Sequence, residues 1–159
     1  MRKTEQNPGS DLIAISGQFA EFDQFVEFAA AWDIDFQQIG PGALNATLSQ
    51  VVGQSWSLAR GQFDQAAYQQ GAAIAGMRTF AILDPQASEH EWCGRPFSPD
   101  SIAVFASDGE FQSISQPGFA VYTVSFTDEQ LAAACERLGI PNVLEKFSAG
   151  GAIMKIDHR

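Results

Sequence analysis

The stretch that decides the fold runs from Trp32 to Gln65 and reads WDIDFQQIGPGALNATLSQVVGQSWSLARGQFDQ. Apolar and polar residues alternate over residues 44–49, which is typical of a strand with one buried face. Residues 34–36 give the same signal, and the Gly-Pro-Gly sequence at 40–42 favours a turn between the two segments. The alternation resumes over residues 56–63. The stretch therefore predicts a three-stranded antiparallel meander.

Beyond this stretch, apolar segments at residues 77–83, 101–106, 111–114 and 119–126 predict four more strands. The Asp-Gly pair at 108–109 predicts a hairpin turn that joins two of them. Residues 86–99 are interpreted as a long loop. Some seven strands at short spacing indicate a sandwich or a barrel.

Helices are predicted on either side of the strands. Residues 22–29 place apolar side chains at helical spacing, which indicates a short helix that caps one end of the sheet. Thr127 and Gln130 form a capping-box pattern, and Gly139 marks the end of that helix. A second short helix is expected over residues 142–147. The predicted fold class is thus mainly β with flanking helices.

We divide the chain into four parts on this basis. Residues 1–17 are predicted to be a flexible arm, and residues 18–126 to be the β domain with its leading helix. Residues 127–149 are predicted to be a helical segment. Residues 150–159 are expected to be a tail or linker, because two glycines precede a basic end.

Length and charge restrict the classes of function. The 159 residues suffice for one domain with a sizeable core, and the net charge of −10 with nine Lys and Arg argues against direct contact with nucleic acid. No stretch is apolar and long enough to predict a membrane span, and no signal peptide is recognisable. Cys93 and Cys135 have unlike surroundings, which favours a reducing compartment. We expect a cytoplasmic protein without a membrane partner.

Residues for catalysis or metal binding are scarce. The histidines are His90, predicted in a solvated loop, and His158 in the tail, and no His-x-His pattern favours a metal site. Cys93 lies three residues from His90, but no further motif supports a nucleophile. No phosphate-binding glycine loop is present. The prediction is a non-enzyme with no catalytic residue, no metal and no cofactor.

Two alternatives stay open for the large side chains. Thirteen phenylalanines and three tryptophans can fill a core or line a pocket. Arg60, Arg78 and Arg95 need either a carboxylate partner within the chain or an anionic ligand.

Four segments resemble, in order, motifs of the N-terminal sensing domains of AraC-type transcription regulators. They are Trp32-x-x-x-Phe36-x-Gln38-Ile39-x-Pro41-Gly42, Arg60-x-x-Phe63-Asp64-Gln65, Gly76-Met77-x-x-Phe80 and Trp92-x-Gly94-Arg95. The resemblance covers residues 22–126. It implies a cupin-like double-stranded β-helix that binds a small effector inside the barrel or helps the regulator form a homodimer.

The resemblance also indicates where an effector would bind. It places the pocket between two sheets, and the spacing of the motifs nominates Arg60, Phe63, Phe80, Trp92 and Arg95 as ligand-binding residues. An alternative interpretation is a structural clasp, in which Trp92 covers the barrel mouth and Arg95 pairs with a carboxylate. If the effector pocket is correctly placed, substitution of Arg60 or Arg95 by alanine should abolish effector binding while leaving the fold, which distinguishes a sensor from a pure dimerisation module.

The family's helix-turn-helix motifs have no counterpart after residue 147. The function predicted is therefore a sensing or dimerisation domain of an AraC-type regulator without its DNA-binding part, and an excised or truncated domain is the favoured origin. The alternative is a free-standing cupin-like protein that binds a ligand or a partner. A small cupin enzyme is the less favoured alternative.

Overall fold

The computed structural model describes residues 5–6, 12–29, 31–107, 109–147 and 151–157. Over these residues the chain forms two antiparallel sheets with helices beside them. The elements are β1 (Glu5–Gln6), β2 (Ile13–Phe19), α1 (Phe22–Phe28), β3 (Asp33–Gln38), β4 (Ala46–Val52), β5 (Trp56–Phe63), β6 (Ala67–Ala72), β7 (Arg78–Leu83), β8 (His90–Trp92), β9 (Arg95–Phe97), β10 (Ser101–Val104), β11 (Glu110–Ser115), β12 (Phe119–Phe126), α2 (Asp128–Leu138), the 3₁₀ helix η1 (Val143–Lys146) and β13 (Ala152–Lys155).

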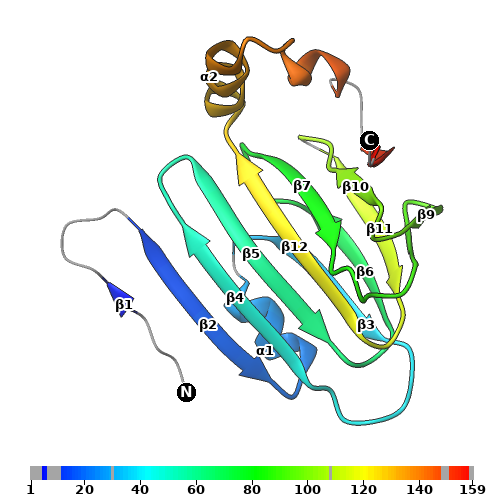
Figure 1. Cartoon of the computed structure of the whole chain (residues 1–159). Coiled ribbons are helices and arrows are strands. Elements are labelled where there is room, and N and C mark those ends of the chain that lie inside the picture. The colour runs from blue at the N-terminus through cyan, green and yellow to red at the C-terminus, as the bar shows by residue number, and fades with distance from the viewer. Residues whose placement is uncertain (1–4, 7–11, 30, 108, 148–150, 158–159) are drawn as a thin grey trace.

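The two sheets face each other as the layers of a sandwich (Figure 1). Sheet A has the strand order β1-β2-β4-β5-β12-β7-β10-β13 in the described part of the chain, and sheet B has the order β3-β6-β11-β8-β9. Every strand pairing is antiparallel. The chain crosses between the sheets several times, so each layer is assembled from segments that are distant in sequence.

Alternation along the strands sends one set of side chains between the sheets. In β7, for example, Thr79, Ala81 and Leu83 are buried while Ile82 between them is exposed. The inward-facing residues of both sheets form one core cluster with the buried face of α1. This cluster encloses the candidate site.

Helix α1 closes one side of the sandwich between β2, β3 and β4 (Figure 1). Its buried rings are Phe22 and Phe25, three residues apart on one face. Phe22 stacks on Phe36 of β3 with ring centroids 5.0 Å apart, and Phe25 meets Phe63 of β5 edge-on at 6.4 Å. The predicted leading helix is confirmed, and it joins the two sheets.

The helical segment after β12 is also confirmed. Thr127 Oγ1 accepts a hydrogen bond from the backbone N–H of Gln130, and Gly139 ends α2 in the left-handed conformation with φ 64°. The second predicted helix is the short 3₁₀ turn η1. Arg78 fastens this segment to sheet A, because its guanidinium donates to Phe147 O at 3.0 Å and meets the Asp128 carboxylate at 3.4 Å.

The predicted meander is wrong in one strand. Strands β4 and β5 pair as expected, but β3 pairs with β6 in sheet B. Likewise β10 and β11 are no hairpin: β10 pairs with β7 and β13 in sheet A, and β11 pairs with β6 and β8 in sheet B. The Gly-Pro-Gly sequence at 40–42 forms a bend between β3 and β4 as expected, whereas the predicted turn at 108–109 includes Asp108, which lies outside the described residues. A turn in a sandwich can carry the chain to the opposite layer as well as to the neighbouring strand.

Two segments that were not predicted to be strands contain three of them. Residues 67–72 form β6 in the middle of sheet B, and the predicted loop of residues 86–99 contains the hairpin β8–β9. His90 was predicted in a solvated loop, yet it is 3% exposed on β8. The polar residues of these segments hid the alternation, because some of the polar side chains are the ones that face inward.

Both ends of the chain differ from the predicted domain limits. Residues 13–17 of the predicted flexible arm belong to β2, which pairs with β4 along its whole length. Residues 152–155 of the predicted tail form β13 and pair with β10. The remainder of these predictions at residues 1–4, 7–11, 148–150 and 158–159, including His158, lies outside the described residues.

Candidate functional site

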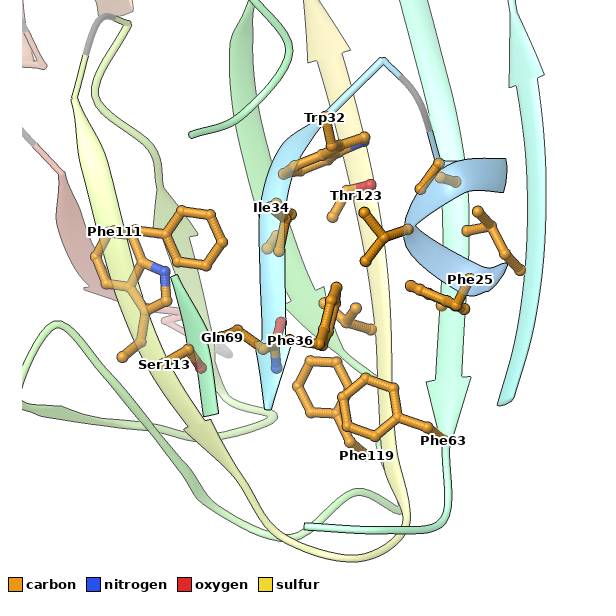
Figure 2. Close-up of a pocket in the computed structure, with 18 of the residues that line it drawn as sticks. Phe25, Trp32, Ile34, Phe36, Phe63, Gln69, Phe111, Ser113, Phe119 and Thr123 are labelled. Carbon is orange, nitrogen blue, oxygen red and sulfur yellow. The ribbon is translucent and has the colours of Figure 1, made fainter. Parts of the chain in front are cut away.

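An interior cavity of about 90 Å³ lies between the two sheets. Figure 2 shows its labelled side chains, which converge from α1, both sheets and the connection before β3. Its lining is almost entirely apolar and aromatic, with three polar side chains among the described residues. These three are Gln69, Ser113 and Thr123.

Sheet A contributes small side chains to the cavity. Ala59 of β5 lies opposite Thr123 of β12, and Thr123 lies opposite Ala81 of β7, so the three form one cross-strand row on the inner face. Gly61 continues the wall along β5. A wall of short side chains leaves space where longer ones would meet the opposite sheet.

Sheet B contributes a row of a different kind. Phe36, Gln69, Ser113 and Trp92 are paired in turn across β3, β6, β11 and β8, so they share one face. All four line the cavity. The row therefore places two polar side chains between two aromatic ones.

The aromatic lining is held by ring-to-ring contacts. Phe63 and Phe119 stack with centroids 4.7 Å apart, and Phe105 meets both Trp92 at 5.4 Å and Trp32 at 5.8 Å edge-on. Such offset and edge-on pairs add to the stability from burial alone. The cavity walls are consequently well defined and supported from several elements.

The polar atoms of the cavity are only partly hydrogen-bonded within the protein. Gln69 Nε2 donates to Ser115 Oγ at 3.3 Å, and Ser113 Oγ donates to the carbonyl of Glu91 at 2.9 Å. Trp92 is 3% exposed, and its Nε1 has no hydrogen-bond partner in the described part of the chain. A buried N–H without an acceptor is unfavourable, so this donor suits a bound acceptor.

His90 lies two residues before Trp92, on the same face of β8. Its Nδ1 accepts a hydrogen bond from the backbone N–H of Gln116 at 2.9 Å, and its ring meets Phe119 edge-on at 4.9 Å. Burial lowers the pKa of His90 from 6.5 to about 4, because the charged imidazolium loses its hydration. The ring is therefore neutral near pH 7, with its proton on Nε2, which has no partner among the described residues.

The structure places two of the five predicted ligand-binding residues at the cavity. Phe63 and Trp92 line it. Phe80 faces the other side of β7, where it contacts Phe147 with centroids 6.4 Å apart. Arg60 lies on the outer face of sheet A, and Arg95 is exposed on β9. These three residues do not contribute to the cavity.

Arg60 and Arg78 find carboxylate partners within the chain, as one of the two interpretations required. Arg60 meets the Asp84 carboxylate at 3.6 Å and donates to Tyr122 Oη at 3.1 Å. Arg78 has the contacts to Asp128 and Phe147 described above. Arg95 has no ion pair with a carboxylate among the described residues, so the alternative of a clasp stays a prediction.

The polar lining residues were missed at the sequence level. A signal was present: Gln69 and Ser113 sit at the inward positions of alternating segments, and Thr123 sits within an apolar strand. Alternation alone assigns polar residues to the solvent side. A polar residue in phase with buried neighbours is the pattern that would have pointed to the site.

The described residues contain neither a cluster of metal ligands nor a membrane-spanning helix. No three His, Cys, Asp or Glu side chains among them gather closely enough to bind a metal ion. None of the described helices has the length and apolar character needed to cross a membrane. Cys93 and Cys135 are free thiols.

Comparisons with known proteins were made against this geometry. No family model and no curated protein sequence matches the chain. Among solved structures, the AraC-like transcriptional activator CuxR is similar with a TM-score of 0.60 and 12% identity, over 79% of this chain and 51% of that one. A deletion mutant of the Bacillus subtilis oxalate decarboxylase OxdC is similar with a TM-score of 0.34 and 10% identity, over 98% and 40% of the two chains.

The similarity to the activator shows a shared fold, and the chain spans about half of the activator's length. Two facing antiparallel sheets with flanking helices make this fold a β-sandwich. The predicted fold class, mainly β with flanking helices, is thereby confirmed, and the activator shares this fold over 79% of the present chain.

Proposed function

We propose that this chain is a small-molecule-sensing domain of an AraC-type transcription regulator. The observation that carries the proposal is the aromatic-lined cavity between the sheets, which contains a few polar groups for orienting a ligand. The fold shared with an AraC-like activator supports the regulatory context. The net charge of −10 agrees with a domain that leaves contact with DNA to another segment.

Binding without turnover is part of the proposal. No described residue that lines the cavity has an acid, base or thiol side chain. The Ser113 hydroxyl is directed to the Glu91 carbonyl, which cannot accept a proton as a general base does. The alternative of a cupin enzyme therefore has no catalytic group at this site in its favour.

Dimerisation is a second candidate function, and the outer face of sheet A supports it. Leu58, Ile82 and Tyr122 are exposed there, with Leu58 at 45%, and Tyr122 lies directly opposite Ile82. Exposed apolar groups on adjacent strands favour association. Light scattering should report a dimer that Leu58→Lys converts to monomer, whereas Leu138→Lys on α2 should leave it intact.

Native mass spectrometry of the purified chain tests the sensing proposal. A retained organic mass, or an added small molecule that binds and is lost on substitution of a cavity residue, is the expected result. The same substitution at an outward position serves as the control. A chain that binds no small organic molecule under these conditions contradicts the sensing proposal and leaves dimerisation as the function.

A further inference from the structure

We propose that the cavity selects a neutral, planar, mostly apolar molecule that carries one hydrogen-bond acceptor, and that Trp92 Nε1–H donates to this acceptor. The inference rests on the proposed sensing function and specifies its ligand class. It follows from three features of the cavity: an unused buried donor, the absence of a cation from its described lining, and the edges and faces of its aromatic rings.

The unused donor is the first feature. Trp92 lines the cavity, and its Nε1 lacks a partner among the described residues although the Ser113 side chain is its direct cross-strand neighbour. The far edge of the indole lies beside Gly151 and the Val104 carbonyl, which restricts the position of the ring. A buried donor held in place costs stability unless an acceptor reaches it. A ligand with a carbonyl or ether oxygen removes that cost.

The charge of the lining is the second feature. No Lys, Arg or His side chain of the described residues lines the cavity. The nearby His90 Nε2–H is uncharged near pH 7, so it offers a dipole but no positive charge. Transfer of an ionised carboxylate or phosphate into such surroundings is very unfavourable. The cavity therefore excludes anions and accepts neutral acceptors.

Shape is the third feature. Phe36, Phe63 and Phe119 present faces and edges from both sheets, and the free volume is about 90 Å³. Flat rings make favourable edge-on or offset contacts with such a lining, whereas sugars would leave many hydroxyl groups unsatisfied. This volume is smaller than the roughly 150 Å³ of an engineered apolar cavity that holds benzene, so the site can take no more than one ring, with any substituent at the side where the cavity is open.

Three probes of similar shape test the proposal. Acetophenone is planar and neutral with a carbonyl acceptor, α-methylstyrene replaces that oxygen by a CH₂ group, and benzoate carries a negative charge. Dissociation constants are measured by ligand-observed NMR at pH 7 for the unmodified chain and for Trp92→Phe. Trp56→Phe on β5 is the matched control, because it makes the same change at an outward-facing strand position.

In the unmodified chain, both neutral probes should bind and benzoate should not. The ratio of the α-methylstyrene constant to the acetophenone constant should fall by about two- to twelve-fold in Trp92→Phe, which corresponds to one hydrogen bond. The ratio should be unchanged in Trp56→Phe. Comparison of ratios cancels the greater hydrophobicity of α-methylstyrene and any general loosening of the cavity.

Each other outcome has a distinct meaning. If the neutral probes bind but the ratio is the same in Trp92→Phe, the donor assignment is wrong while the sensing function survives. Benzoate that binds as tightly as acetophenone overturns the neutral ligand class. If no probe binds to the unmodified chain, the ligand class is wrong, and the sensing function fails with it only if native mass spectrometry also finds no bound organic molecule. If circular dichroism shows that Trp92→Phe does not fold, the probes are measured with Ser113→Ala, which tests the polarity of the site. Benzoate binding to the unmodified chain still tests its charge selection.

Discussion

The central cross-strand rows on the inner faces of the two sheets differ in side-chain size. The central row of sheet A is Ala59, Thr123 and Ala81, all with short side chains. The facing row of sheet B begins and ends with Phe36 and Trp92. Sheets in a sandwich lie about 10 Å apart, so one face of large rings needs a facing row of small residues, and the cavity is the space that this pairing leaves unfilled.

The comparison teaches that the two sheets have different tasks in the site. The central row of sheet A supplies room, although Phe63 and Phe119 of this sheet also line the cavity. The row of sheet B supplies rings and most of the hydrogen-bonding groups. The polar atoms of the site are concentrated on β6, β8 and β11 of sheet B, with Thr123 of sheet A as the exception among the described lining residues. Changes to sheet A should therefore alter how much fits, and changes to sheet B should alter what is recognised.

The largest loss of unfolding free energy is expected when a glycine of sheet B is replaced by alanine, and the same change in sheet A should have little effect. Gly71 of sheet B has φ 143°, and an added Cβ would lie 1.9 Å from the backbone oxygen of Asp33. Gly71→Ala should lower the free energy of unfolding by about 3 kcal/mol or more, because neighbouring strands must separate. Urea unfolding followed by circular dichroism measures this loss.

Gly61→Ala in sheet A is the matched control. Its Cβ would meet Phe25 at 3.7 Å and Val121 at 3.9 Å, which are ordinary contact distances. The free energy of unfolding should be unchanged or rise by up to about 1 kcal/mol, because alanine reduces the entropy of the unfolded chain. If Gly71→Ala and Gly61→Ala lower the free energy of unfolding equally, the two positions do not differ in their tolerance of a Cβ atom.

The next effect concerns His90, the titratable side chain two residues from Trp92 on the same face of β8. His90 has a pKa of about 4 in the folded chain and an ordinary value of 6.5 when unfolded, so between these values the unfolded state binds more protons. The free energy of unfolding should therefore fall as pH drops from 6.5 to 4, by up to about 3 kcal/mol in total. Urea unfolding at a series of pH values measures the slope.

His90→Asn is the control for this pH dependence. The Asn Oδ1 can replace Nδ1 as the acceptor of the Gln116 N–H but does not titrate. The difference in unfolding free energy between the two chains should change with pH over the window from 6.5 to 4 and be constant above it. Parallel profiles would show that His90 is solvated in the folded chain.

Filling the small row of sheet A should remove ligand binding at a smaller cost in stability. Ala81→Leu adds three carbon atoms at the cavity wall. Acetophenone binding should weaken by about ten-fold or more, and overpacking should cost about 1–3 kcal/mol of unfolding free energy. Ala14→Leu is the control, because Ala14 lies in the outward row with Val51 and Leu58. Unchanged binding in Ala81→Leu would place the ligand elsewhere.

The smallest effect is expected at Arg60. Its ion pair with Asp84 is partly exposed, and its other contacts lie on the outer face of sheet A. Arg60→Ala should change the free energy of unfolding by less than about 1 kcal/mol and leave probe binding unaltered. This replaces the expectation from sequence that Arg60→Ala abolishes effector binding. Loss of binding without loss of fold would restore Arg60 to the site.

Periodicity and caps allowed several local elements to be predicted. The strand at residues 119–126, the α1 helix and the capped helix α2 follow from signals within a few residues of one another. The partners of β3 and β11 did not follow, because a turn sequence does not specify whether the next strand joins the same layer. Gln69 and Ser113 were missed at the cavity for a different reason, because alternation alone assigns polar residues to the solvent side.

The sequence by itself determined the fold class, the ends of the main helices and the aromatic character of the interior. These depend on local spacing, on side-chain volume and on the free energy of removing apolar groups from water. Only the tertiary structure decided that the short row of Ala59, Thr123 and Ala81 would face the row from Phe36 to Trp92. The rows come from seven strands distributed along the chain, and their meeting across two layers is fixed by non-local pairing, which no segment encodes alone.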